Sequence, residues 1–141
     1  MLEPRIISHV IDLVVEAGAL ITSELQRPNG PRGSSYKADI DVEIEVMVRR
    51  GLEQILSCDF VGEETGKHQS GHRYCWVVDP NDGTADFLAC RPGSAISVGL
   101  LDGIEPVLGV VYAPASPRGP DCIAWQEGMQ SILRNGRVIA P

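Results

Sequence analysis

Two long apolar stripes precede a series of short β-rich runs, and this order constrains the fold more than any other feature of the chain. In residues 4–26 and 40–56, apolar side chains recur at three- and four-residue steps, the period of an amphipathic helix. Helices followed by successive strands predict an α+β fold, with two amino-terminal helices packed on a largely antiparallel sheet. The strands are expected at residues 60–61, 74–78, 95–101, 107–112, 122–125 and 131–133.

The start of the second stripe is also compatible with a strand. From Ile40 to Val48, apolar and other residues alternate with the period of a half-buried strand. The helical stripe continues to residue 56, however, which is longer than a usual strand, so a helix is favoured. Between the two helices, residues 28–35 are rich in proline, glycine and serine, which predicts an exposed, mobile loop.

Length and charge limit the class of protein. The 141 residues and 43% hydrophobic content predict one globular domain over residues 1–141. A net charge of −7 argues against binding a nucleic-acid polymer and favours a small-molecule partner. No apolar run approaches the length of a membrane span, and the first residues lack the basic region of a secretory signal. A cytoplasmic protein without membrane contact is therefore expected.

The cysteines and histidines offer no ligand pattern. Cys58, Cys75, Cys90 and Cys122 are widely spaced, with no Cys-x-x-Cys pair, which favours buried free thiols over a zinc site or a disulfide framework. The polar stretch 66–73 contains two of the three histidines and is interpreted as a solvated loop.

The apolar strand that ends at Val78 continues into the sequence Asp-Pro-Asn-Asp-Gly-Thr. Asp79 and Asp82 could bind a hard divalent ion, to which the Asn81 carbonyl could add a neutral oxygen. Gly83 allows close backbone approach, and Thr84 stands where a short helix could begin and its amides could attract phosphate. The same residues are also ordinary turn formers, so this stretch alone does not decide between a metal site and a turn.

Several motifs in a fixed order decide in favour of the metal site. They are Lys-Ala-Asp-x-x-Val-Glu at 37–43, Phe-Val-Gly-Glu-Glu at 60–64, Trp-Val-Val-Asp-Pro-x-Asp-Gly-Thr-x-x-Phe at 76–87, Ser-Val-Gly at 97–99 and Gly-Val-Val-Tyr-Ala-Pro at 109–114. Together these motifs resemble the inositol monophosphatase family of Mg²⁺-dependent, Li⁺-sensitive phosphatases, over nearly the length of the chain. The resemblance implies the amino-terminal half of the layered sugar-phosphatase fold.

The resemblance implies a cluster of Mg²⁺ ligands. Glu63 matches a ligand of the first metal, and Asp79 matches an aspartate that bridges two metals. The Asn81 carbonyl would bind the first ion and Asp82 the second, with two or three Mg²⁺ ions in a complete site.

The resemblance also implies how the attacking water and the phosphate are held. Gly83 and Thr84 match positions whose backbone amides hold the substrate phosphate. Asp39 matches the aspartate that partners the Thr84 hydroxyl and helps to deprotonate the water, and Glu64 matches an assisting acid. The implied reaction is hydrolysis of a small phosphate monoester such as an inositol monophosphate, by attack of a metal-activated water without a covalent enzyme intermediate.

Departures from the family pattern leave the activity and the substrate open. Family members are longer and continue into a second half with a Trp-Asp-x-Ala-Ala-Gly motif, whose aspartate completes the second metal site. No Trp-Asp pair occurs here. Asn81 replaces the usual aliphatic residue, and Ala-Asp-Phe at 85–87 replaces a typical Thr-Asn-Phe, which also resembles the 3′(2′),5′-bisphosphate nucleotidases.

The open alternatives are therefore a bisphosphate nucleotidase, a phosphatase of histidinol phosphate, a catalytically incomplete remnant that binds metal or phosphate, and a purely structural domain. The family resemblance also implies a homodimer, or a partner that supplies the missing half.

Overall fold

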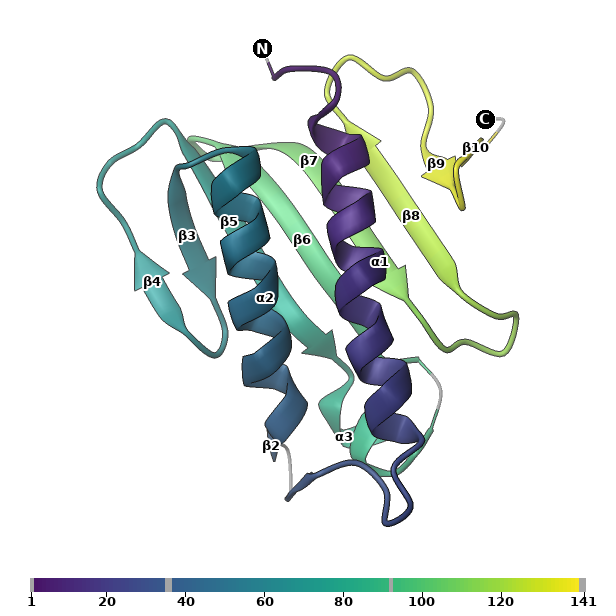
Figure 1. Ribbon diagram of the computed structural model, residues 1–141. Helices are drawn as coiled ribbons and strands as arrows, with labels where there is room; N and C mark the ends of the chain where they lie inside the picture. The colour runs from purple at the N-terminus through teal and green to yellow at the C-terminus, as the bar shows by residue number, and fades with distance from the viewer. Residues whose placement is uncertain (1, 35–36, 92, 140–141) are drawn as a thin grey trace.

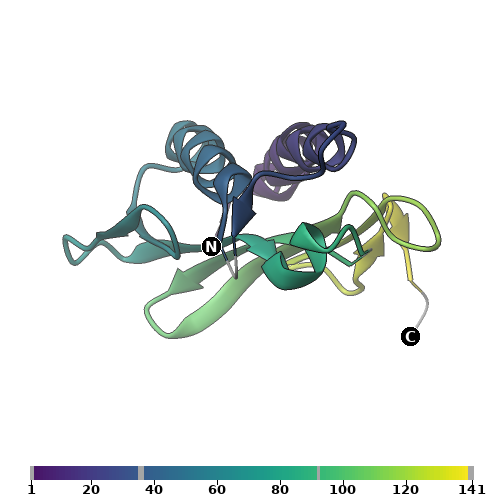
Figure 2. The same cartoon turned by 90° about the horizontal axis from the view of Figure 1, so that it is seen from below.

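Two helices lie side by side on one face of an eight-stranded sheet in the computed structural model, which describes residues 2–34, 37–91 and 93–139 (Figures 1 and 2). The α+β fold expected from the sequence is thereby confirmed. The helices are α1 (Ile6–Leu25), α2 (Asp39–Ile55) and α3 (Thr84–Leu88). The strands are β1 (Gly33–Ser34), β2 (Lys37–Ala38), β3 (Asp59–Gly62), β4 (Gly66–His68), β5 (Tyr74–Asp82), β6 (Ala95–Asp102), β7 (Glu105–Ala113), β8 (Asp121–Gln126), β9 (Leu133–Arg134) and β10 (Arg137–Val138).

The order of the strands brings two strand ends to the same edge of the sheet. The order is β10-β9-β8-β7-β6-β5-β3-β4, while β1 and β2 form a separate pair. Among the strands described, β3 and β5 are the one parallel pair, and all other neighbours run antiparallel. Since parallel strands end at the same edge, the segments that follow Gly62 and Val78 become neighbours.

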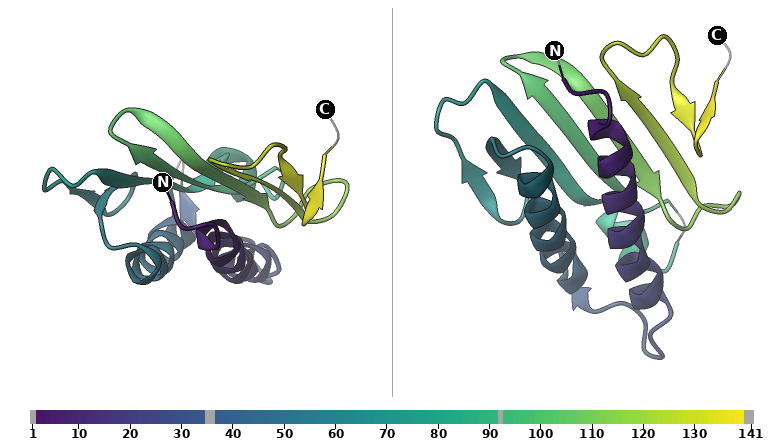
Figure 3. Two further views of the ribbon diagram at one scale, coloured as in Figure 1. Left: turned by 90° about the horizontal axis from the view of Figure 1, so that it is seen from above. Right: turned by 45° about the horizontal axis from the view of Figure 1, so that its top comes forward.

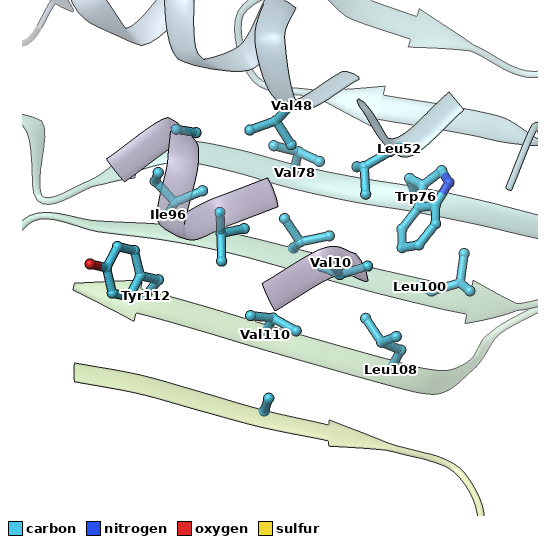
Figure 4. Close-up of a cluster of buried hydrophobic side chains, with 14 of the residues drawn as sticks. Val10, Val48, Leu52, Trp76, Val78, Ile96, Leu100, Leu108, Val110 and Tyr112 are labelled. Atoms are coloured by element: carbon cyan, nitrogen blue, oxygen red, sulfur yellow. The ribbon is translucent and has the colours of Figure 1, made fainter. Parts of the chain in front are cut away.

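The core lies between the helices and the sheet (Figure 4). Alternate residues of the strands face the helices, as the period of two predicts, and Trp76, Val78 and Leu100 are almost fully buried there. The Trp76 indole Nε1 also donates to the Leu56 carbonyl at 2.9 Å, which satisfies the polar atom that the core encloses. The helices approach closely at Gly51, where an added Cβ would lie 2.4 Å from Leu13 Cδ1.

The two long helices α1 and α2 lie on the same face of the sheet and leave the opposite face free of both (Figure 3). Strand residues that point away from the core include Val77, Val111 and Ile123, with exposed fractions of 39%, 45% and 42%. Apolar side chains of the strands are therefore accessible on the face opposite α1 and α2.

Helix α1 is long and apolar enough to cross a membrane, judged by its length and composition. This differs from the expectation that no apolar run approaches that length. In the structure, Val10, Val14 and Ile21 of α1 are buried in the core, while Asp12 and Glu16 face outward. Its packing is thus that of an amphipathic core helix.

An ion pair fixes the loop between α1 and α2, which the sequence predicted to be exposed and mobile. The carboxylate of Glu24, only 4% exposed, accepts hydrogen bonds from the Arg32 side chain and from the Arg32 backbone N–H. Residues 33–34 then pair with 37–38 as β1 and β2. Ser35, the last residue of the predicted loop, lies outside the described residues.

Two further local predictions are wrong in part. The stretch 66–73 is exposed, as predicted, but it contains strand β4, which pairs with β3, and the segment after β4 is held by Asp59. The four cysteines are free, as predicted, but Cys90 is exposed and only Cys122 is buried. Local composition does not reveal the pairing of β4 with β3 or the bonds to Asp59.

The Asp59 carboxylate predicts a stability that falls in acid. It accepts from Ser70 Oγ at 2.6 Å and from the backbone N–H groups of Ser70, Gly71 and His72 at 3.0–3.1 Å. These bonds, led by the Ser70 hydroxyl, hold the pKa of Asp59 below its ordinary value of 3.8. A lowered folded-state pKa contributes stability that is complete above 3.8 and is lost as the pH falls through the lower value.

Urea unfolding between pH 6 and pH 2 measures this contribution. Asp59→Asn is expected to be less stable than the wild type at pH 6 and to show a flatter pH dependence below pH 4. Glu53→Gln, an exposed carboxyl on α2, is the matched control. Equal pH slopes for Asp59→Asn and the wild type would contradict the prediction.

Candidate active site

Every residue of the predicted site except Asp39 follows or ends one of the two parallel strands. Glu63 and Glu64 come directly after β3, and β5 continues through Asp79 to Asp82. The predicted turn is thus part of a strand, in which the register shifts between Asp79 and Asp82. Helix α3 begins directly afterwards, at the same end of the sheet as the start of α2 (Figure 1).

Glu63 and Asp79 lie near each other at the ends of the paired strands β3 and β5. A hydrogen bond with Asp79 and the charge of that residue raise the pKa of Glu63 to about 7. Both side chains remain accessible, since Glu63 is exposed and Asp79 half-buried. Two carboxyl groups held together at an open edge repel each other unless a proton or a cation lies between them.

The donor atoms at this edge are of the kind that Mg²⁺ prefers. Mg²⁺ prefers oxygen ligands and is commonly bound by one or two carboxylates, with water and phosphate completing its shell. Glu63, Asp79 and the Asn81 carbonyl offer such oxygens. Asp82 is exposed, and within residues 2–34, 37–91 and 93–139 no three His, Cys, Asp or Glu side chains gather closely enough to hold a metal.

The Thr84 hydroxyl pairs with Asp41, not with Asp39. Thr84 Oγ1 lies 3.2 Å from Asp41 Oδ2 and 2.9 Å from the Asn81 carbonyl oxygen, so it can donate to either acceptor. Asp41 is 3% exposed, whereas Asp39 is exposed in the first turn of α2, where Ala38 is the N-cap residue. The predicted pairing of Thr84 with Asp39 is therefore wrong, and the partner is Asp41, two residues later.

A buried amide completes the surroundings of Asp41. Asn81 Nδ2 donates to Asp41 Oδ1 at 2.9 Å, and Ser94 Oγ donates to Asn81 Oδ1. Burial raises the pKa of Asp41, and the hydrogen bonds from Asn81 and Thr84 act in the opposite direction. Both oxygens of this carboxylate thus have a donor.

Glu45 is a second carboxylate on α2 that sequence reasoning missed. It is fully buried, and it accepts from the Glu64 N–H at 3.0 Å and from the Thr65 N–H. One turn later, Arg49 Nη1 donates to Thr65 Oγ1 at 3.0 Å. Helix α2 therefore fixes the Gly-Glu-Glu-Thr segment through its backbone and leaves the Glu63 and Glu64 side chains outside.

Gly83 and Glu64 are both exposed to solvent, as their predicted roles in phosphate binding and acid assistance require. Gly83 has φ +90°, a conformation that favours glycine, and it directly precedes α3. Glu64 is exposed, but partial desolvation of its carboxyl group, followed by the charge of Asp41, raises its pKa. These positions are accessible to a phosphate group and to solvent.

The helical stripe itself contained the signal for Asp41 and Glu45. The pattern Asp-x-x-apolar-Glu occurs twice, once from Asp39 to Glu43 and again from Asp41 to Glu45. Only the second pair lies inside the apolar stripe defined by Ile44 and its neighbours on the buried face. A carboxylate at a buried helical position needs a donor, which favours the second register.

Comparison with known proteins agrees with the fold and the motifs. The model of the family described as "Inositol monophosphatase family" matches residues 3–138. An inositol-1-monophosphatase from Synechocystis sp. is 38% identical over 113 residues, which cover 73% of this chain and 38% of that protein. A fructose-1,6-bisphosphatase/inositol-1-monophosphatase from Aquifex aeolicus is 48% identical over 56 residues, 40% of this chain and 21% of that protein.

Solved structures show the same arrangement of elements. An inositol monophosphatase from Thermotoga maritima has a TM-score of 0.78 at 25% identity, over 94% of this chain and 52% of that chain. The extragenic suppressor protein suhB from Bartonella henselae has a TM-score of 0.80 at 22% identity, over 93% of this chain and 52% of that chain. The chain thus spans about half the length of these structures and less of the curated relatives.

Proposed function

The chain belongs to the inositol monophosphatase family, and from that premise we propose that it is a Mg²⁺-dependent hydrolase of a small phosphate monoester such as an inositol monophosphate. One observation carries the proposal. The parallel strands β3 and β5 end side by side, so that Glu63 and Asp79 meet next to the Asp41–Thr84 pair. Metal-binding oxygens and a group that can orient a water are then neighbours.

In this proposal Glu63, Asp79 and the Asn81 carbonyl would hold one Mg²⁺ ion, and the exposed Asp82 would bind a second. The bound ion supplies positive charge that neutralises the phosphate and lowers the pKa of a bound water. The Gly83 and Thr84 amides bind a phosphate oxygen, which the open position of Gly83 supports.

Thr84 and Asp41 orient the attacking water. The Thr84 oxygen accepts a hydrogen bond from the water and donates its own proton towards Asp41 Oδ2. Asp41 takes the role that the sequence predicted for Asp39, because Asp41 is the carboxylate in contact with the hydroxyl. Glu64, exposed beside the metal ligands, assists as an outer acid.

The proposal also covers the location, the Li⁺ sensitivity and the assembly of the protein. We place it in the cytoplasm, sensitive to Li⁺ and assembled as a homodimer. One observation supports assembly: the apolar residues Val77, Val111 and Ile123 are exposed on the face of the sheet opposite α1 and α2.

A substrate panel and calorimetry test the proposed function together. Phosphate release is measured from inositol 1-phosphate, adenosine 3′,5′-bisphosphate and histidinol phosphate, with Mg²⁺ and with added Li⁺. Turnover of the first that needs Mg²⁺ and falls with Li⁺ is expected, whereas preference for the second would make the chain a bisphosphate nucleotidase. Mg²⁺ binding without any turnover would identify a remnant that binds metal.

Asp79→Asn is expected to abolish Mg²⁺ binding in calorimetry and turnover with it, because one of the two contacting carboxylates is lost. Asp102→Asn is the matched control, since Asp102 pairs with Tyr74 at the opposite end of β5. If Asp79→Asn binds Mg²⁺ with unchanged affinity, the proposed metal site is wrong, whether or not the variant turns over substrate.

A further inference from the structure

We propose that the side chain of Asn81, fixed by Ser94, is a positioning group that holds the Asp41 carboxylate towards Thr84. This inference rests on the proposed function for its kinetic consequence only. The backbone carbonyl of Asn81 was assigned to the metal, whereas its side chain had no role. The structure gives that side chain two specific partners.

The three side chains form a chain of hydrogen bonds with a defined direction. Ser94 Oγ donates to Asn81 Oδ1, which orients the amide so that its Nδ2 group points at Asp41. Asn81 Nδ2 then donates to Asp41 Oδ1 at 2.9 Å, which leaves Asp41 Oδ2 as the acceptor for the Thr84 hydroxyl at 3.2 Å. The amide thereby selects which carboxylate oxygen faces the hydroxyl.

Burial makes these bonds decisive. Asp41, Asn81 and Ser94 are each 3% exposed, so water cannot readily replace a lost donor. An apolar residue at position 81 would leave Asp41 Oδ1 without its partner, and the carboxylate would turn to find another donor. Asn81 and Asp41 are forty residues apart in sequence, so their contact also joins α2 to the strand that carries Asp79.

A double-mutant cycle on unfolding tests the contact without any need for turnover. Asn81→Leu is expected to lower the urea midpoint of the wild type, and at least half of this shift should disappear in an Asp41→Leu background. Ser70→Ala is the matched control, because Ser70 donates to Asp59 instead and its effect should be the same in both backgrounds. An equal effect of Asn81→Leu with and without Asp41 would overturn the proposal.

Proton exchange of the wild-type side chain provides a second test if Asp41→Leu does not fold. The Asn81 side-chain NH₂ should exchange with solvent more slowly than that of the exposed Asn29, and Ser94→Ala should accelerate it. Exchange of Asn81 as fast as that of Asn29 would overturn the contact.

Kinetics separate positioning from a merely structural role. Asn81→Leu and the isosteric Asn81→Asp keep the backbone carbonyl, so both should lower kcat by about tenfold or more with little change in KM, while Ser70→Ala leaves both constants unchanged. A wild-type protein without turnover would contradict the proposed function. The double-mutant cycle on unfolding would still show whether the Asn81 side chain bonds to Asp41. A full kcat in both Asn81 variants of an active enzyme would overturn the positioning role.

Discussion

Glu45→Ala is expected to lower the free energy of unfolding by roughly 2–5 kcal/mol, since it leaves two backbone N–H groups without their acceptor in a buried site. The carboxylate is fully buried and accepts from the N–H groups of Glu64 and Thr65. Its loss also opens a cavity beside Gly62, where an added Cβ would lie 2.5 Å from Glu45 Oε2. Chemical denaturation measures the change.

Glu53→Ala provides the control for this prediction. Glu53 lies on the same helix but is exposed, so its replacement should change stability by no more than about 0.5 kcal/mol. A similar small loss for Glu45→Ala would mean that the Gly-Glu-Glu-Thr segment does not depend on the buried carboxylate.

Asp41→Asn is expected to reduce kcat by about 10² to 10⁴, because the amide cannot accept the proton that the Thr84 hydroxyl passes on. The replacement is isosteric and its Oδ1 can still accept from Asn81, so a folded protein is expected. Initial rates with the best substrate of the phosphate panel give the measurement.

Asp39→Asn is the matched control, two residues earlier on the same helix. It is exposed, and the Thr84 hydroxyl bonds to Asp41 and to the Asn81 carbonyl instead, so kcat should stay within about twofold of the wild type, as is usual for a surface replacement. The reverse result, with loss of activity in Asp39→Asn and not in Asp41→Asn, would restore the first register of the motif and contradict the structure.

The sequence predicted the fold well where burial follows a period. Helices expected at 4–26 and 40–56 are found at Ile6–Leu25 and Asp39–Ile55, because one continuous face of each helix packs on the sheet. Strand β4 escaped prediction because all its residues are exposed and it owes its conformation to pairing with β3. Pairing of this kind leaves no periodic signal in the strand itself.

Prediction of the candidate site was limited by local ambiguity. The motifs at Glu63 and Asp79 predicted the two strand ends proposed to bind metal. The pattern Asp-x-x-apolar-Glu fits from either Asp39 or Asp41, so spacing alone could not show which aspartate contacts Thr84. Burial distinguishes the two aspartates, and burial depends on which face of α2 meets the sheet. The roles of Glu45 and Ser94 depend on contacts across 19 and 13 residues, which no local motif contains.

Helix α2 contacts both segments of the site from a single face. Asp41 bonds to Asn81 and Thr84, while Glu45 and Arg49, each one turn further along, bond to the segment after β3. A helix moves as a rigid rod, so a shift of α2 displaces both segments at once. Opening of either segment should therefore be coupled to opening of the other, and the two would exchange their amide protons as one cooperative unit.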